Sequence, residues 1–149
     1  MSSIKQLMLV ATVEQKREQN CALQFKQANA HLQANQQKLS GLEQYRLDYM
    51  HSIRAKAAKG IGAKAMNQYH QFITQLDKAC EQQVHVISQS LLVVDQRKRQ
   101  WLAQQQKHKA IIYLVDLKKR HAKQTADKQE QKLFDEISLQ RAIRKPHYQ

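Results

Sequence analysis

Apolar residues recur along the first third of the chain at alternating spacings of four and three residues. This spacing is typical of a helix that packs along one side against another helix. Fifteen positions follow the repeat, and eleven of them are apolar. They are Ile4, Leu7, Ala11, Glu14, Glu18, Cys21, Phe25, Ala28, Leu32, Asn35, Leu39, Leu42, Arg46, Tyr49 and Ile53. The unbroken run predicts one helix over about residues 4–58 with a coiled-coil seam.

Four positions of this repeat carry polar side chains. A single asparagine in a coiled-coil seam fixes the register of the two helices at a cost in stability, and Asn35 is expected to do so. Glu14, Glu18 and Arg46 have aliphatic stems, so we expect their charged groups to reach past the edge of a narrow seam. The polar positions therefore leave the coiled-coil prediction intact.

A second apolar series predicts another long helix over about residues 63–143. Its members are Met66, Tyr69, Ile73, Leu76, Cys80, Ile87, Val94, Trp101, Ile111 and Val115, with Gln83, Ser90 and Arg97 interrupting it. Neighbouring apolar residues such as Phe72 and Val84 widen the series, and the pattern thins toward the C-terminal end. Pro146 marks the last point at which this helix can end.

Two of the chain's three glycines, Gly60 and Gly62, lie between the two series. A glycine enters the left-handed conformation of a helix C-cap at little cost, so a reversal near residues 59–63 is expected. The fold class is then all-α: a long antiparallel two-helix coiled-coil hairpin that forms one elongated domain over residues 1–149. Partner residues have numbers that add to about 121, so residues after about 118 form an overhanging C-terminal helix without a partner.

The positive charge is concentrated toward the C-terminal end. The net charge is +13, and residues 97–149 contribute fourteen Lys and Arg against five Asp and Glu. A basic segment of this kind indicates an acidic partner surface, anionic lipid or nucleic acid, and a solvated helix face is the alternative. The overhang is therefore either frayed in isolation or a binding segment for another protein.

The residue pattern disfavours catalysis, cofactor binding and metal binding. None of the seven histidines lies four residues from another histidine or a cysteine, so we interpret them as surface residues. Asp135 and Glu136 are adjacent and diverge on a helix, and no glycine-rich phosphate loop follows a strand. Cys21 and Cys80 lack metal spacing and are expected in the seam as reduced thiols, which suits the cytoplasm.

Membranes and nucleic acids are also disfavoured as direct partners. No window approaches the roughly 20 apolar residues of a transmembrane helix, and no insertion into lipid is expected. A basic-region zipper needs a basic helix that continues into a parallel dimer seam. Here the seam folds back, and Asp116, Asp127 and Glu130 interrupt the basic end. We therefore expect a monomer that binds other proteins.

A stripe just after the turn is a candidate interface. Phe72, Leu76, Ala79 and Gln83 are spaced four, three and four residues apart, so they lie along one side of the second helix. This side is rotated from the seam, and one partner helix does not cover both. Phe72 is therefore a candidate exposed aromatic anchor. The alternative is that its ring flanks the seam.

Several stretches resemble the flagellar FliJ family. The turn Gly60-Ile61 is followed over residues 67–82 by NQYHQFITQLDKACEQ, in which Tyr69, Phe72 and Ile73 form a Tyr-X-X-Phe-Ile motif. Residues 42–49 (LEQYRLDY) and 142–146 (AIRKP) match as well, and Trp101 fits the family layout. The resemblance spans nearly the whole chain in length and layout, with the specific identities in the middle third.

The resemblance implies a non-enzymatic component of the flagellar type III protein export apparatus, with a hairpin similar to the stalk subunit of rotary ATPases. The implied partners are the hexameric export ATPase and its regulator, the cytoplasmic domain of the membrane export gate, and export chaperones. The implied location is the cytoplasm, at the inner membrane beneath the flagellum. The implied gate-binding residues are Phe72, Leu76, Ala79 and Gln83. The expected ATPase-binding residues are Lys118, Lys119, Arg120, Arg141, Arg144 and Lys145. A stalk protein of a virulence type III secretion system and a generic coiled-coil adaptor are the alternatives.

Overall fold

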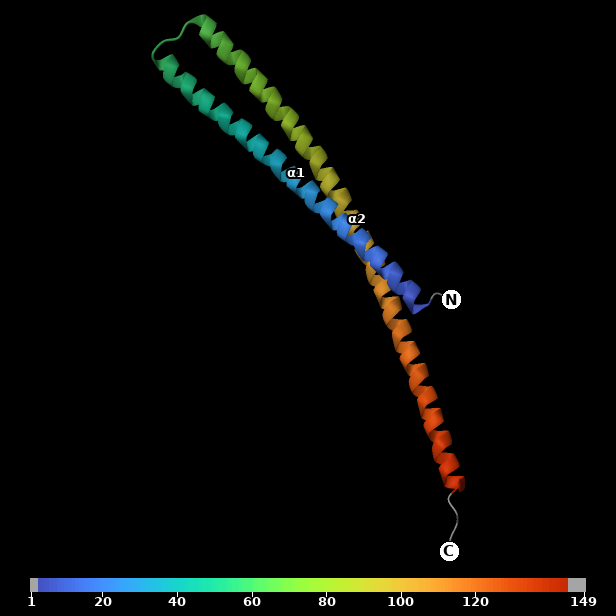
Figure 1. Ribbon diagram of the computed structural model, residues 1–149. Helices are drawn as coiled ribbons and strands as arrows, with labels where there is room; N and C mark the ends of the chain where they lie inside the picture. The colour runs from blue at the N-terminus through green and yellow to red at the C-terminus, as the bar shows by residue number, and fades with distance from the viewer. Residues whose placement is uncertain (1–2, 145–149) are drawn as a thin grey trace. The chain divides into compact units, whose positions relative to one another are not determined.

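The computed structural model describes residues 3–144, and this part of the chain consists of two helices and a turn (Figure 1). Helix α1 spans Ile4–Ala58 and helix α2 spans Ala63–Arg144. Among the described residues there is no strand. The helices pack against each other in antiparallel directions, which confirms the predicted all-α helical hairpin. Pro146 lies outside the described residues.

Local hydrogen bonds account for the helix ends. The backbone N–H of Gln6 donates to Ser3 Oγ at 3.2 Å, and the Ser3 N–H donates to Gln6 Oε1 at 3.0 Å. This reciprocal pair is a capping box, which satisfies two N–H groups at the start of α1. At the other end of α1, Gly60 has a φ of 88° and its N–H donates to the carbonyl of Ala57. The turn therefore forms where the chain offers a residue without a Cβ.

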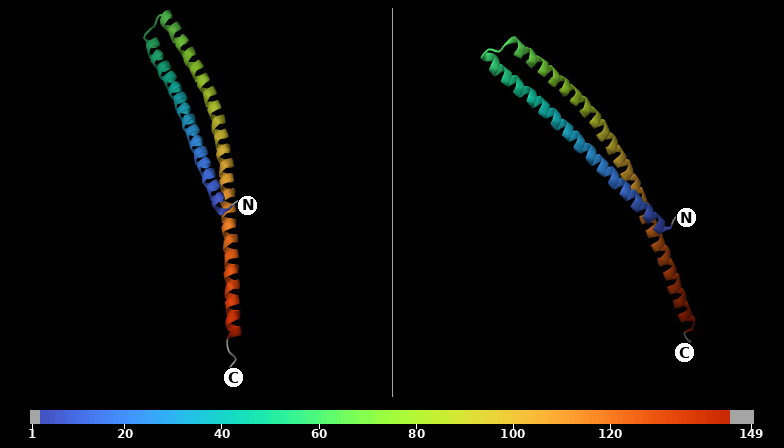
Figure 2. Two further views of the ribbon diagram at one scale, coloured as in Figure 1. Left: turned by 45° about the vertical axis from the view of Figure 1, so that its right-hand side comes forward. Right: turned by 45° about the horizontal axis from the view of Figure 1, so that its top comes forward.

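The described chain divides into two compact units, each containing parts of both helices. The first unit, here the terminal unit, contains residues 3–18, which include the start of α1, and residues 104–144 of α2. The second, here the turn unit, contains residues 19–103, and its two helices lie side by side from the turn onward in every view (Figures 1 and 2). The prediction of a single domain over the whole chain stays a prediction.

The expected seam is the one that the helices bury. All fifteen positions of the repeat in α1 are buried or half-buried, whereas most residues between them are exposed. Few of the residues in the range 3–144 are buried: they are Ala11, Leu76, Val115, Gln83 and Ser90. Two helices alone cannot enclose a side chain from all sides, so most of the seam stays partly accessible. The hairpin is thus stabilised by a long, thin interface.

Contacts in the turn unit agree with the expected pairing of the helices. Arg97 donates from Nη1 to Gln24 Oε1 at 3.3 Å, and the rings of Phe72 and Tyr49 lie 4.6 Å apart between centroids. Both pairs have residue numbers that add to 121. At the end of the unit farther from the turn, the indole of Trp101 stacks on the ring of Phe25, with centroids 5.7 Å apart.

Polar pairs occupy the seam of the terminal unit, and they correct two expectations from the sequence. Gln104 Nε2 donates to the Glu14 side chain, and His108 Nδ1 lies 2.6 Å from Glu18 Oε2. The Glu14 and Glu18 side chains are only 13% and 21% exposed, so they lie within the seam rather than beyond its edge. His108, with a side chain 20% exposed, is not the surface residue that its spacing suggested. Each carboxylate enters the seam because the other helix presents a hydrogen-bonding partner there.

The terminal unit also contains a stretch of α2 that α1 does not cover. Val115 is the last buried residue of α2, with 7% exposure, and it lies near the level where α1 begins. From Lys119 to Arg144 every residue is exposed. We call residues 119–144 the overhang. Its position agrees with the pairing arithmetic, since a helix that starts at Ile4 has no residues left to pair with it.

Candidate partner-binding sites

Phe72 lies in an aromatic cluster that joins the two helices of the turn unit. Its ring is tilted against Tyr49, and it meets Tyr45 edge to face at 5.9 Å. Tyr49 in turn stacks on Tyr69 at 5.5 Å. Phe72 is half-buried, so the expectation of an exposed anchor is wrong and the alternative of a ring that flanks the seam is correct. The outer ring of the cluster is that of Tyr45, which is 52% exposed.

The other members of the Phe72 stripe are divided between the seam and its edge. Leu76 and Gln83 are 8% and 5% exposed and lie between the helices, while Ala79 is half-buried. The four residues therefore do not form one exposed face. Leu76 and Gln83 belong to the stripe and also occupy seam positions, so the stripe and the seam are not separate sides of α2. Gate binding by these residues stays a prediction.

Gln83 belongs to a buried polar cluster with Asn35 and Ser90. Gln83 Nε2 donates to the Asn35 carbonyl at 2.9 Å and to Asn35 Oδ1 at 3.1 Å. Asn35 Nδ2 donates to Ser90 Oγ at 3.3 Å and to the His31 carbonyl at 3.0 Å. Buried polar groups strongly favour the arrangement in which all are paired. The cluster thus gives Asn35 the specific partners that a register-determining asparagine needs.

Phe72→Ala is expected to destabilise the hairpin by about 2 kcal/mol. The value is below that for a fully buried phenylalanine because the Phe72 ring is only partly buried. Thermal unfolding followed by circular dichroism measures the effect, and Tyr45→Ala is the matched control at the exposed edge of the same cluster. Equal unfolding temperatures for wild type and Phe72→Ala would contradict the packing role of the ring.

The basic residues proposed for the ATPase are mostly on the overhang. Lys119, Arg120, Arg141 and Arg144 are exposed, and Lys118 is half-buried at its start. Arg120 forms an ion pair with Asp116 at 2.9 Å, one helical turn earlier. Lys145 lies outside the described residues. These candidate cations thus lie at the two ends of the overhang, and Lys123, Lys128 and Lys132 lie exposed between them.

The terminal unit also exposes many large apolar side chains. On the overhang these are Leu133, Phe134, Ile137, Leu139 and Ile143. Near the start of α1 and on the facing part of α2 they are Met8, Leu9, Val10, Val13, Ile112, Tyr113, Leu114 and Leu117. Most of the second group lies outside the seam repeat, and only the apolar run over residues 7–10 indicates it in the sequence. In the terminal unit both helices thus expose apolar side chains, and covering them all would take more than one partner surface.

The described residues contain no group of three or more His, Cys, Asp or Glu side chains arranged to hold a metal ion. Cys21 and Cys80 are free thiols, both half-buried. No helix within residues 3–144 is apolar enough over a sufficient length to cross a bilayer.

These features place the chain among all-α helical hairpins with polar layers in a long seam and an uncovered C-terminal helix. Residues 3–147 match the profile of the family described as flagellar FliJ protein, and the chain belongs to this family. A flagellar FliJ protein from Salmonella typhi is 29% identical over 114 residues, which cover 76% of this chain and 78% of that protein. No solved structure matches the chain. Membership of the family makes the chain a component of the flagellar export apparatus.

Proposed function

We propose that the chain is a non-enzymatic connector of the flagellar export apparatus. Its terminal unit binds the hexameric export ATPase, and its turn unit binds the cytoplasmic domain of the membrane export gate and the export chaperones. The regulator of the ATPase binds in the same assembly. The protein works in the cytoplasm, held at the inner membrane by these contacts. The observation that carries the proposal is the uncovered overhang, within a family of flagellar proteins.

The physical state of the overhang supports a protein partner. Helical stability in proteins comes mostly from packing of an apolar face, and α1 does not cover the overhang. Phe134 and Ile143 are 68% and 73% exposed. Burial of such side chains by a partner is favourable by about 25 cal/mol for each Å² of apolar surface. Covering the overhang therefore both stabilises its helix and provides binding energy.

The charges of the overhang select the kind of partner. Lys119 and Arg120 lie at its beginning and Arg141 and Arg144 at its end. Cations in the last turn of a helix also interact favourably with the helix dipole, so Arg141 and Arg144 support the helix as well. An acidic protein surface with apolar patches matches this pattern. We assign that surface to the axial opening of the export ATPase ring.

For the gate, the aromatic cluster is the candidate anchor. The exposed ring of Tyr45 and the accessible edge of Phe72 lie on one side of the turn unit. Leu76 and Gln83, which are buried, act by holding this edge in place, and Ala79 lies beside it. A partner that binds one state of the gate more tightly than another shifts the gate toward that state. The proposed mechanism is thus mechanical and allosteric.

Truncation of the chain after Lys118 is the test. We expect the full chain to bind the purified export ATPase and raise its rate of ATP hydrolysis, and the truncated chain to lose most of that stimulation. Because Val115 and Lys118 are retained, the seam stays complete and thermal unfolding of the turn unit should be unchanged.

Two matched pairs of substitutions separate charge from apolar contact. Arg141→Gln with Arg144→Gln removes cations at the end of the overhang, and Phe134→Ala with Ile137→Ala removes apolar surface. Both pairs are expected to raise the Kd for the export ATPase by about tenfold, which corresponds to about 1.4 kcal/mol of binding free energy. Stimulation at limiting concentration of the chain should fall accordingly. Full stimulation by the truncated chain would show that the overhang is not the ATPase contact, and absence of binding by the full chain would leave a coiled-coil adaptor with another partner.

A further inference from the structure

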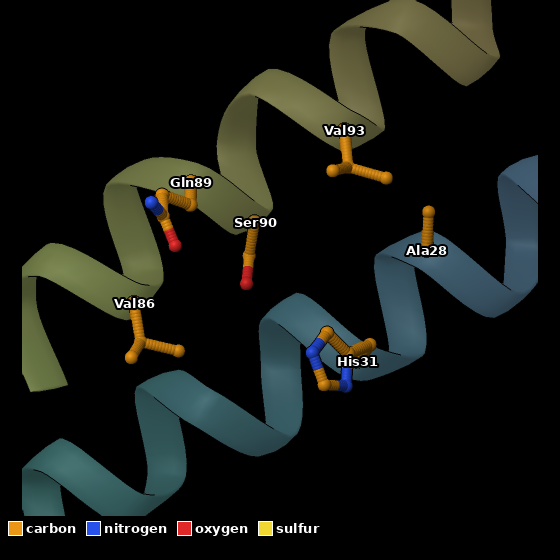
Figure 3. Close-up of a pocket in the computed structure, with 6 residues that line it drawn as sticks. All are labelled: Ala28, His31, Val86, Gln89, Ser90 and Val93. Carbon is orange, nitrogen blue, oxygen red and sulfur yellow. The ribbon is translucent and has the colours of Figure 1, made fainter.

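The turn unit contains a groove between α1 and α2, farther along the helices from the turn than the aromatic cluster is (Figure 3). Ala28 and His31 line it from α1. Val86, Gln89, Ser90 and Val93 line it from α2 (Figure 3). Ser90 is buried and closes the floor, whereas Val93 is 42% exposed and His31 is exposed. The groove thus offers accessible apolar surface on a closed base.

Both walls of this groove repeat every seven residues. On α2 the wall continues through Phe72, Ala79, Val86 and Val93. On α1 the facing positions are Gln24, His31, Lys38 and Tyr45. A seven-residue repeat on two paired helices forms a straight seam into which a third helix with the same repeat can pack. The α2 wall is apolar and the α1 wall is polar, so the matching helix is amphipathic.

The charges beside the groove are positive and are not neutralised by the contacts around them. Arg97 donates from Nη1 to Gln24 Oε1 and to Gln100 Oε1, and both acceptors are neutral amides. Lys38 is exposed on the same wall two heptads from Gln24, which is about 21 Å along a helix. The residues that line the groove include no carboxylate. Carboxylates from a partner would form charge-assisted hydrogen bonds at these two levels.

We propose that this groove binds an amphipathic helix of another protein as the third helix of a bundle. The partner helix presents apolar residues at heptad spacing to Val86 and Val93, and carboxylates about 14 residues apart to Arg97 and Lys38. A second copy of this chain does not match, since its groove side carries the same positive charges. The same walls continue to Phe72 and Tyr45, the proposed gate anchor, but the levels that the partner helix contacts, from Arg97 to Lys38, end before them. The inference therefore goes beyond the proposed function, because it requires neither the export ATPase nor the Phe72 edge.

The test uses a synthetic helical peptide of 21 residues with leucine at the two heptad core positions and glutamate at the flanking positions. A fluorescent label on the peptide reports binding to the full chain by anisotropy. A control peptide has lysine in place of every glutamate. We expect the glutamate peptide to bind at least about tenfold more tightly than the lysine peptide, with an advantage that falls as salt rises.

Substitutions in the protein locate the bound peptide. Val93→Glu places a like charge in the groove and is expected to weaken binding of the glutamate peptide by about tenfold or more, and Arg97→Gln to weaken it severalfold. The matched control is Leu92→Glu, because Leu92 adjoins Val93 but is 71% exposed on the side away from α1. Circular dichroism of each variant checks that the hairpin is folded, and Val93→Ser replaces Val93→Glu if it is not.

Four results would overturn the proposal. They are absence of binding of the glutamate peptide, equal binding of the two peptides, an equal loss for Leu92→Glu and the Val93 variant, and a dimer in sedimentation that Val93→Glu dissociates. The last would identify a second copy as the occupant. None of these measurements uses the export ATPase or the export gate, so failure here is distinguishable from failure of the proposed function.

Discussion

Trp101→Ala is expected to lower the free energy of unfolding by about 3 kcal/mol. The indole stacks on Phe25 with centroids 5.7 Å apart and planes 18° from parallel. Truncation of a buried tryptophan or phenylalanine to alanine typically costs 3–5 kcal/mol through lost transfer energy and a residual cavity. Trp101 is half-buried, which places the expected loss at about the lower end of that range. In a thin seam no other side chain of comparable size can fill the space.

Urea denaturation followed by circular dichroism measures this loss. Leu102→Ala is the control, because Leu102 neighbours Trp101 but is 42% exposed. Trp101→Phe should recover much of the stability, since a phenyl ring can still stack on Phe25. If Trp101→Ala and Leu102→Ala shift the midpoint equally, the indole does not stabilise the hairpin through this stack.

Asn35→Ala is expected to destabilise the hairpin by about 2 kcal/mol. Loss of the amide leaves the buried side chain of Gln83 with only the backbone acceptor at residue 35, and it deprives Ser90 of its donor. Buried polar groups left without partners cost about 1–3 kcal/mol each. The measurement is urea denaturation of Asn35→Ala, Gln83→Ala and the double variant, which together form a thermodynamic cycle.

The cycle should give a coupling free energy of about 1 kcal/mol between the two residues. Replacement of both by leucine is expected to behave differently, because two apolar groups leave no unpaired polar atoms there. That variant should be at least as stable as the wild type but should unfold less cooperatively, since an apolar layer permits other registers. Additive effects of the two alanine substitutions would show that the cluster does not act as a unit.

The long elements of this fold could be predicted because each depends on a pattern within one segment of chain. The fifteen seam positions of α1 followed from the alternating spacing alone, and all of them are covered in the structure. The turn followed from Gly60, whose φ of 88° is the conformation that glycine favours. The uncovered stretch of α2 followed from the unequal lengths of the two helices.

The candidate sites were less predictable, because they depend on how two helices face each other. Helical spacing placed Phe72 near the seam but could not decide whether its ring was covered, and Tyr45 and Tyr49 on α1 decide that. Likewise, the groove beside Val86 and Val93 exists only because α1 presents Ala28 and His31 at the same level. The pattern along α2 alone was compatible with a covered or an exposed Phe72 ring, and with the presence or absence of a groove.

Two long helices joined at Gly60, one apolar seam and a basic, uncovered end all follow from patterns along the chain. Those properties are local, since they depend on helical period, turn chemistry and charge. Which polar residues the seam accepts depends instead on how the two helices face each other. Glu18 and His108 are ninety positions apart, and a carboxylate is tolerated inside the seam only where the other helix brings it a partner. That pairing depends on the register of two helices.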